Sequence, residues 1–144
     1  MLIAAGAECV SAALARPLPA MADESAADAA DLVKELIGET AVESGRVHLD
    51  MPKQFPTGYT VPLSLKVDSA MTADDHVRHV RVLAPRNPIV EVLNFQVVPN
   101  RSEARVETRI RLAQPQFVVA VAEMHDGTFL MAKTWVAVAT NGCS

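Results

Sequence analysis

Hydrophobic and polar residues alternate along most of the chain from residue 46 onward. The alternation is clearest over residues 103–112. One face of this segment carries Val106, Thr108, Ile110 and Leu112, and the other carries Arg105, Glu107, Arg109 and Arg111. Because side chains point alternately to the two faces of a strand, the pattern predicts a strand with one buried and one exposed face.

Similar patterns predict seven strands, separated by turn residues rich in Pro, Gly, Asn and Asp. The strands are Arg46–Asp50, Thr60–Asp68, His76–Leu83, Val90–Pro99, Glu103–Ala113, Gln116–His125 and Thr128–Ala139. The strongest hairpin signal is Asp126–Gly127 between two apolar runs. With no helix between the strands, the pattern predicts an all-β fold, an immunoglobulin-like antiparallel β-sandwich of about seven strands.

A short N-terminal helix is predicted over Asp28–Ile37, ahead of the strands. Its apolar residues recur at helical spacing, and Gly38 follows at the position of a C-cap. The apolar residues are Leu32, Val33, Leu36 and Ile37. We expect this helix to cover one end of the sandwich.

Residues 1–22 differ from the rest and resemble a secretory signal peptide. Leu2–Leu14 is mostly small and apolar, and it is followed by Ala20-Met21-Ala22, a small-x-small pattern that places cleavage after Ala22. No basic residue precedes Arg16, so two interpretations stay open: a signal whose start lies upstream of Met1, or an N-terminal helix that is retained. We expect one β-sandwich domain over residues 23–139 and a mobile arm over residues 140–144.

The net charge of −4 argues against nucleic acid as a partner, since DNA and RNA binders need a basic face. Apart from the N-terminal stretch, no segment is long and apolar enough to suggest a membrane span. We therefore expect neither nucleic acid nor membrane as a partner.

Familiar catalytic motifs, phosphate-binding loops and metal-ligand spacings are absent from the sequence. The four histidines are His48, His76, His79 and His125. His76 and His79 lie three apart on a predicted strand, so we expect them to face opposite sides. No metal site, cofactor or catalytic residue is assigned, and the chain is not expected to be an enzyme in its own right.

Cys143 is the candidate reactive residue of the sequence, because its side chain is a thiol near the end of the chain. The sequence holds two cysteines, and Cys9 would leave with the signal peptide. A lone cysteine in an exported protein is either a free reactive thiol or half of an intermolecular bridge. Five residues beyond Val138 reach at most roughly 17 Å, enough for the thiol to enter a partner's cleft. The alternative is an idle tail whose cysteine is incidental or dimerises the protein.

Several stretches of the chain resemble the SoxY family, the carrier subunit of the bacterial Sox system for thiosulfate oxidation. They are residues 71–77, 82–88, 108–113 and 118–124, followed by Asp126–Gly127 and Met131–Lys133. The likeness runs from about the first helix to the last strand and is most specific over residues 108–133.

The resemblance implies a periplasmic β-sandwich that pairs with a SoxZ-like subunit and is exported by the twin-arginine route. Sulfur intermediates would be attached covalently to the cysteine of a Gly-Gly-Cys-Gly-Gly arm. A haem-containing SoxAX-type enzyme would join thiosulfate to the thiol, and a SoxB-type hydrolase would then release sulfate. The carrier itself turns nothing over.

The arm of this chain departs from the family's motif. Gly142 and Cys143 match it, whereas Asn141 takes the place of the first glycine and Ser144 that of the glycine after the cysteine. Asn tolerates unusual backbone angles and Ser is small, so we expect Asn141, Gly142 and Ser144 to keep the arm flexible. Two interpretations remain open: a working carrier, or a divergent binding or structural subunit without carrier activity.

Overall fold

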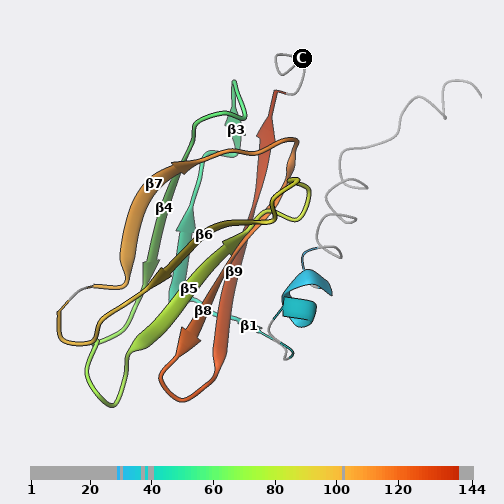
Figure 1. The fold of residues 1–144 in the computed structure, drawn as a ribbon. Helices are drawn as coiled ribbons and strands as arrows, with labels where there is room; N and C mark the ends of the chain where they lie inside the picture. The colour runs from blue at the N-terminus through green and yellow to red at the C-terminus, as the bar shows by residue number, and fades with distance from the viewer. Residues whose placement is uncertain (1–28, 30, 37, 39–40, 102, 140–144) are drawn as a thin grey trace, which may run out of the picture.

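The computed structural model describes residues 29, 31–36, 38, 41–101 and 103–139, and its described strands form a two-layer β-sandwich (Figure 1). All seven predicted strands are present. They are β2 (Val47–Asp50), β4 (Val61–Val67), β5 (Val77–Leu83), β6 (Glu91–Gln96), β7 (Arg105–Ile110), β8 (Gln116–Met124) and β9 (Phe129–Val138). Two strands were not predicted, β1 (Val42–Glu43) and β3 (Gln54–Phe55), and each has two residues.

The strands divide into a sheet with the order β2-β4-β7 and a sheet with the path β1-β9-β8-β5-β6, in which β3 also pairs with β9. The seven longer strands pair antiparallel, as predicted, whereas β1 and β3 run parallel to β9. Strand β6 is the fourth of the seven longer strands, and it pairs with the third, β5. In a constant-type immunoglobulin domain the fourth strand pairs instead with the fifth, in the other sheet. The all-β sandwich is therefore confirmed, with a different placement of one strand.

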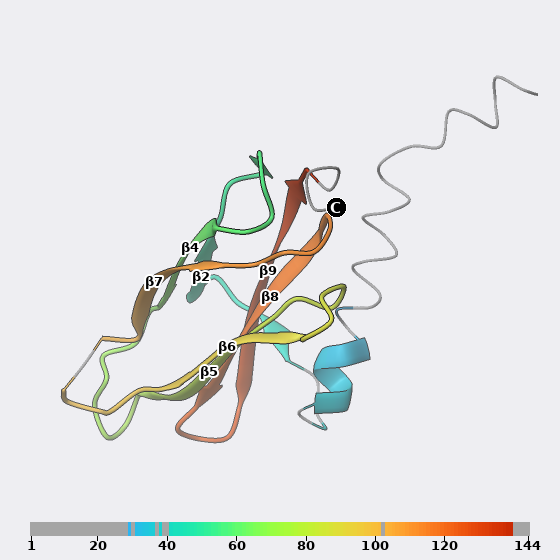
Figure 2. The same cartoon turned by 45° about the horizontal axis from the view of Figure 1, so that its top comes forward.

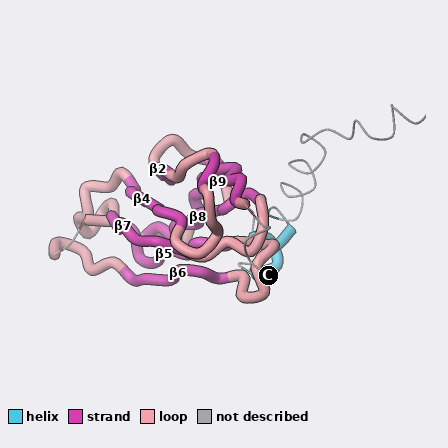
Figure 3. The backbone as a smooth tube through the Cα atoms, turned by 90° about the horizontal axis from the view of Figure 1, so that it is seen from above, coloured by secondary structure: helices cyan, strands magenta, loops and turns pink. Residues whose placement is uncertain are grey.

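The core lies between the two sheets and follows the alternation of the sequence. In β4, Val61, Leu63, Leu65 and Val67 are buried, and the residues between them are not. Strand β7 shows the predicted pattern, with its charged residues exposed and Ile110 buried. In β8, alternate residues belong to two different hydrophobic clusters, one between the sheets and one on the outer face. Viewed from above, the two sheets appear as separate layers (Figure 3).

The N-terminal helix, described at residues 29 and 31–36, lies on the outer face of the larger sheet and not at an end of the sandwich (Figures 1 and 2). Its buried residues, Ala29 and Val33, pack with apolar side chains of three strands. These strand residues are Leu83, Val119, Val121 and Met131. The expected end position was wrong because this outer face is itself apolar and needs a cover. Gly38 has a φ of 71° and its N–H donates to the Lys34 carbonyl at 2.9 Å, as a C-cap does.

A β-bulge in β5 corrects the expected placement of two histidines. The register between β5 and β8 shifts between Val77 and His79. The extra residue breaks the period of two, so His76 and His79 line the same shallow depression and do not face opposite sides.

The predicted Asp126–Gly127 hairpin joins β8 to β9. Gly127 has a φ of 86°, and the Met124 N–H donates to the Thr128 carbonyl at 2.9 Å. In the part of the chain that the structure describes, no helix has both the length and the hydrophobicity needed to cross a lipid bilayer.

Candidate functional site

The sequence-predicted site residues Asn141, Gly142, Cys143 and Ser144 lie outside the described residues, as does the predicted signal peptide. What the structure describes is the place where the arm is attached. The last described residue is Ala139, one residue after β9. Chain geometry alone keeps Cys143 within about 14 Å of Ala139, because each residue spans at most ~3.6 Å.

Strand β9 is held on both sides where the arm begins. On one side β8 pairs with it, with Gln116 opposite Val136. On the other, β3 pairs Gln54 with Ala137 and Phe55 with Val138, and the Ala137 N–H donates to the Lys53 carbonyl at 2.9 Å. The arm is therefore attached to a strand whose last residues have fixed positions. We call this end of the sandwich the arm end; its loops are residues 51–60, 84–90 and 111–115.

Gly58 connects two of the arm-end loops at a very close approach. The Leu112 N–H donates to the Gly58 carbonyl at 2.8 Å. A Cβ atom on residue 58 would lie 2.0 Å from the Leu112 carbonyl oxygen and 3.6 Å from the Val138 side chain. Only glycine fits this position without a shift of the backbone. The loop before β4 therefore packs directly against Leu112, which follows β7, and lies close to Val138 at the end of β9.

Gln116 forms the centre of a polar network that joins the other loops. Its side chain is fully buried. Its Oε1 accepts from the Arg86 N–H at 2.8 Å, and its Nε2 donates to Asn87 Oδ1 at 3.0 Å and to the Gln114 carbonyl at 3.1 Å. Asn87 extends the network to the β7–β8 loop, since it donates to the Arg111 carbonyl and accepts from the Ala113 N–H. The polar atoms of the buried amide are thus all paired.

Replacing Gln116 with leucine is expected to lower the free energy of unfolding by about 2 kcal/mol. The substitution removes the Gln116 acceptor of the Arg86 N–H and one of the two hydrogen bonds that Asn87 Oδ1 accepts, the other coming from the Ala113 N–H. Gln114→Leu is the matched control, because this side chain is exposed and makes one long contact, 3.4 Å to the Arg86 carbonyl. Urea unfolding measures both, and equal losses would show that the buried network contributes little.

A groove of about 600 Å3 opens between the arm-end loops and the edge strands β6 and β7. Two apolar side chains at its border are exposed, Ile89 at 76% and Tyr59 at 46%. The Arg111 guanidinium lies over the Tyr59 ring, 4.7 Å from its centroid. The groove is lined by Gly58, Tyr59, Asn87, Pro88, Ile89, Glu91, Val92, Arg109, Ile110, Arg111, Leu112 and Ala113.

The two ends of the sandwich differ in charge. The arm-end loops contain Lys53, Arg86 and Arg111, and within residues 51–60, 84–90 and 111–115 there is no aspartate or glutamate. The loops of the opposite end, residues 44–46, 68–76, 97–104 and 125–128, carry mostly carboxylates. Their charged residues are Asp68, Asp74, Asp75, Glu103 and Asp126 against Arg46 and Arg101. In a chain of net charge −4 the arm-end loops are thus basic, and the groove beside them is also lined by Arg109 and Glu91.

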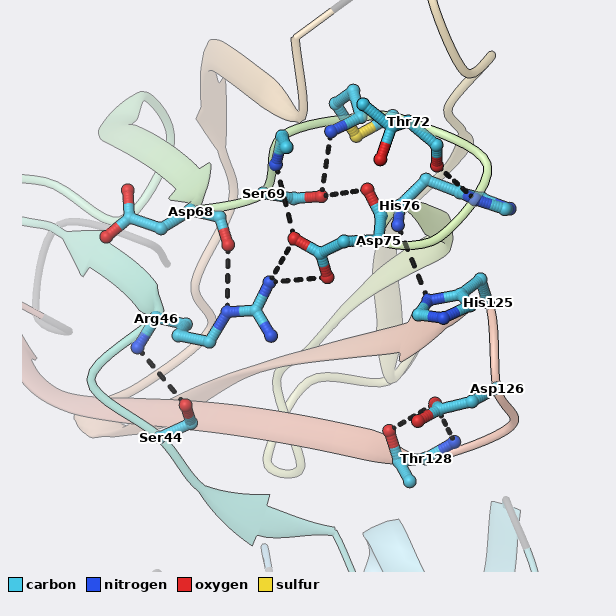
Figure 4. A network of polar contacts seen from close by, with 12 residues as sticks. Ser44, Arg46, Asp68, Ser69, Thr72, Asp75, His76, His125, Asp126 and Thr128 are labelled. Carbon is cyan, nitrogen blue, oxygen red and sulfur yellow. Dashed lines mark hydrogen bonds and ion pairs between the residues drawn. The ribbon is translucent and has the colours of Figure 1, made fainter.

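The acidic end is organised around an ion pair of Arg46 and Asp75 (Figure 4). Arg46 Nη2 lies 2.9 Å from both carboxylate oxygens, and its Nε donates to the Asp68 carbonyl at 2.9 Å. The hydrogen bonds from Arg46, and that from the Ala70 N–H, hold the pKa of Asp75 below its ordinary value of 3.8. This pair ties β2 to the loop between β4 and β5.

Asp75→Asn is expected to lower stability at neutral pH but not in strong acid. Because the folded-state pKa is depressed, ionised Asp75 stabilises the fold fully above its unfolded pKa, near 3.8, and this contribution disappears as pH falls through the lower folded-state pKa. Urea midpoints measured from pH 7 downward should begin to converge for the two proteins below about pH 4, and should meet once the pH lies below the folded-state pKa of Asp75. Asp74→Asn makes the same charge change one residue away. A gap of constant size across this range would contradict the role of the ion pair.

The histidines are used in local hydrogen bonds. His76 Nδ1 lies 2.8 Å from the Thr72 carbonyl oxygen. The backbone N–H of His76 donates to His125 Nδ1 at 3.4 Å (Figure 4). His79 bonds Asn94, and His48 pairs with Asp68 at 2.7 Å. Over the described residues, no three His, Cys, Asp or Glu side chains gather as metal ligands would.

Sequence reasoning did not single out Gly58, Gln116 or the groove. Pro56-Thr57-Gly58 has the composition of a turn, but a turn signal does not reveal that a neighbouring carbonyl fills the space of a Cβ. The charge difference between the ends could have been found, because loops between antiparallel strands alternate between the two ends of a sandwich.

Comparison with known proteins gives one family and one fold. The family described as "Sulfur oxidation protein SoxY" matches residues 33–143. A search of curated protein sequences finds no match. Among solved structures, the sulfur carrier protein SoxY from Chlorobium limicola f thiosulfatophilum has a TM-score of 0.63 and 23% identity, and the alignment covers 80% of this chain and 99% of that one.

A superoxide reductase (neelaredoxin) variant from Ignicoccus hospitalis shares the fold at lower similarity. Its TM-score is 0.59 with 14% identity, over 73% of this chain and 87% of that one. At these identities both structures support the β-sandwich alone.

Proposed function

Because the chain belongs to the SoxY family of sulfur oxidation proteins, we propose that it is a sulfur carrier that holds sulfur intermediates covalently on Cys143. The observation that carries this proposal is the extent of the family match, which continues past β9 to residue 143 and so includes the cysteine. The fold agrees, since a sulfur carrier protein SoxY is among the similar structures.

Loading consists of forming one sulfur–sulfur bond. The Cys143 sulfur bonds to the sulfane sulfur of thiosulfate, the thiol proton goes to solvent, and two electrons pass to a SoxAX-type haem enzyme. An ordinary thiol, with a pKa of about 8.5, is a few per cent thiolate at neutral pH, which suffices when the partner supplies the oxidant. The product is a cysteine S-thiosulfonate.

Release of sulfate leaves the carrier loaded with one sulfur atom. Water attacks the sulfonate sulfur in a SoxB-type hydrolase, the bond between the sulfonate and sulfane sulfurs breaks, and sulfate leaves with the added oxygen. Cys143 then carries a persulfide, which further enzymes process. In this scheme the chain supplies an attachment point and a scaffold, and partner enzymes supply the chemistry.

Partners and location are proposed on the basis of the same family membership. We propose a heterodimer with a SoxZ-like subunit, transient contacts with the two enzymes, and export to the periplasm by the twin-arginine route after cleavage behind Ala22. Asn141, Gly142 and Ser144 would give the arm its freedom. An alternative, favoured by the departure of Asn141 and Ser144 from the family's glycines, is a binding subunit that carries no sulfur.

Intact mass spectrometry tests the proposal. The mature chain, expressed with its SoxZ-like partner, is incubated with thiosulfate and the SoxAX-type enzyme of the same genome. We expect an S-thiosulfonate adduct, which peptide mapping places on Cys143. A free thiol that stays unmodified would favour the binding subunit, and thiosulfate turnover by the isolated chain would favour an enzyme.

A further inference from the structure

An enzyme that acts on Cys143 has to approach the arm end of the sandwich. The described chain ends at Ala139, and four residues span at most about 14 Å. A partner that receives the thiol in a recessed active site therefore brings the surface around its entrance against the loops nearest Ala139. These are the loops that β3, Gly58 and Gln116 hold in place.

The surface in this position has the composition of a protein-binding site. Ile89 and Tyr59 are two of the five large apolar side chains that are exposed among the described residues. They lie at the groove of about 600 Å3, next to Arg111. Tyrosine and arginine are enriched at protein interfaces, whose buried centres are more apolar than the rest of the surface.

Charge at the arm end favours one kind of partner surface. Lys53, Arg86 and Arg111 are the charged residues of its loops, whereas the opposite end is acidic. A partner with carboxylates around its active-site entrance would be attracted to the arm end and repelled by the other end. Such a field orients the carrier, with its arm foremost, before contact is made.

We propose that the groove at the arm end is the docking surface for the partner enzymes, and that it takes an apolar side chain from an acidic rim around their active-site entrance. The inference rests on the proposed function. Ile89 and Tyr59 supply the apolar contact, and Arg111, held over Tyr59, pairs with a carboxylate of the rim. Docking by this surface places the arm at the entrance of the partner's active site. A reach of about 14 Å from Ala139 is then enough to deliver the thiol.

The test separates loading of the thiol from docking. The carrier, expressed with its SoxZ-like partner, is loaded chemically with tetrathionate. The Cys143 thiolate attacks a sulfane sulfur, the central sulfur–sulfur bond breaks, and thiosulfate leaves with the electron pair. This gives the S-thiosulfonate without any enzyme. Intact mass then reports whether the thiol of each variant can be loaded.

Sulfate release from the loaded carrier by the SoxB-type hydrolase of the same genome is the readout. The test variant combines Ile89→Ser with Arg111→Glu. The matched control combines Val42→Ser with Arg101→Glu, which removes an exposed valine and reverses an exposed arginine away from the groove. We expect all three proteins to load equally. We expect kcat/KM to fall on the order of ten-fold for the test variant and to stay within about two-fold for the control. Added salt should reduce kcat/KM of the wild type more than that of the test variant.

Three outcomes would overturn the docking proposal. Equal hydrolysis of test and control variants would show that the enzyme contacts another surface. Faster tetrathionate loading of the test variant with unchanged hydrolysis would show that the groove binds the arm itself and shields its thiol. Loss of co-purification with the SoxZ-like subunit in the test variant alone would assign it to that subunit. Failure of the wild type to load, by contrast, would contradict the proposed function and not the docking surface alone.

Discussion

Replacing Cys143 with serine is expected to abolish the sulfur adduct completely. Serine has nearly the same size, but its hydroxyl is not a nucleophile at neutral pH without a strong base and forms no sulfur–sulfur bond. Because the exchange replaces a single sulfur atom with an oxygen atom, we expect little change in the unfolding midpoint, which serves as the control for folding. Intact mass of the proposed mature chain, which begins at Asp23 after Ala22, measures the loss after exposure to thiosulfate with the SoxAX-type enzyme or to tetrathionate alone.

Cys9→Ser is the control for this prediction. The sequence has two cysteines, and a full-length precursor would contain both. We expect the Cys9 variant to keep the adduct and the Cys143 variant to lose it. An adduct that persists in Cys143→Ser and disappears in Cys9→Ser would contradict the carrier role assigned to the arm.

Gly58→Ala is expected to destabilise the fold strongly. The new Cβ would lie 2.0 Å from the Leu112 carbonyl oxygen, and a backbone atom cannot move aside as a flexible side chain can. We expect a loss of about 3 kcal/mol in the free energy of unfolding, at the upper end of the usual cost of overpacking. Urea unfolding followed by the fluorescence of Trp135 measures it.

Gly45→Ala makes the same chemical change in an open position. A Cβ on residue 45 would meet no atom within 4 Å, so its effect should stay within about 0.5 kcal/mol. Sulfate release gives a second readout, because a shifted residue 58 displaces Tyr59 in the groove. If Gly58→Ala and Gly45→Ala were equally stable, the close approach to Leu112 would not constrain the loop.

The alternation of hydrophobic and polar residues predicts the long strands well, because a strand with one buried face needs an apolar side chain at every second position. Strands β4 and β7 show it directly, with Leu63 and Leu65 buried and Glu107 and Arg109 exposed. Strands β1 and β3 could not be found in this way. Two residues are too few to show a period, and both strands exist because the edge of β9 offers unpaired backbone groups.

Features that depend on contacts between distant segments were not predictable from local pattern. Gln116 begins a predicted strand, but nothing in its neighbourhood signals that Arg86 and Asn87, about thirty positions away, meet its amide. The helix illustrates the same limit. Its periodicity shows that one side is buried, while the apolar outer face that it covers becomes visible only when β5, β8 and β9 lie together.

The placement of β3 has a mechanical consequence for the proposed delivery of Cys143 to partner enzymes. Tension applied at residue 140 along the axis of β9 does not peel the strand away bond by bond. The hydrogen bonds of an antiparallel pair run across the strands, so those to β8 are loaded together in shear, with β3 sharing the load at Ala137 and Val138. If partner enzymes handle Cys143 as proposed, they could pull on residue 140 without separating β9 from the sheet.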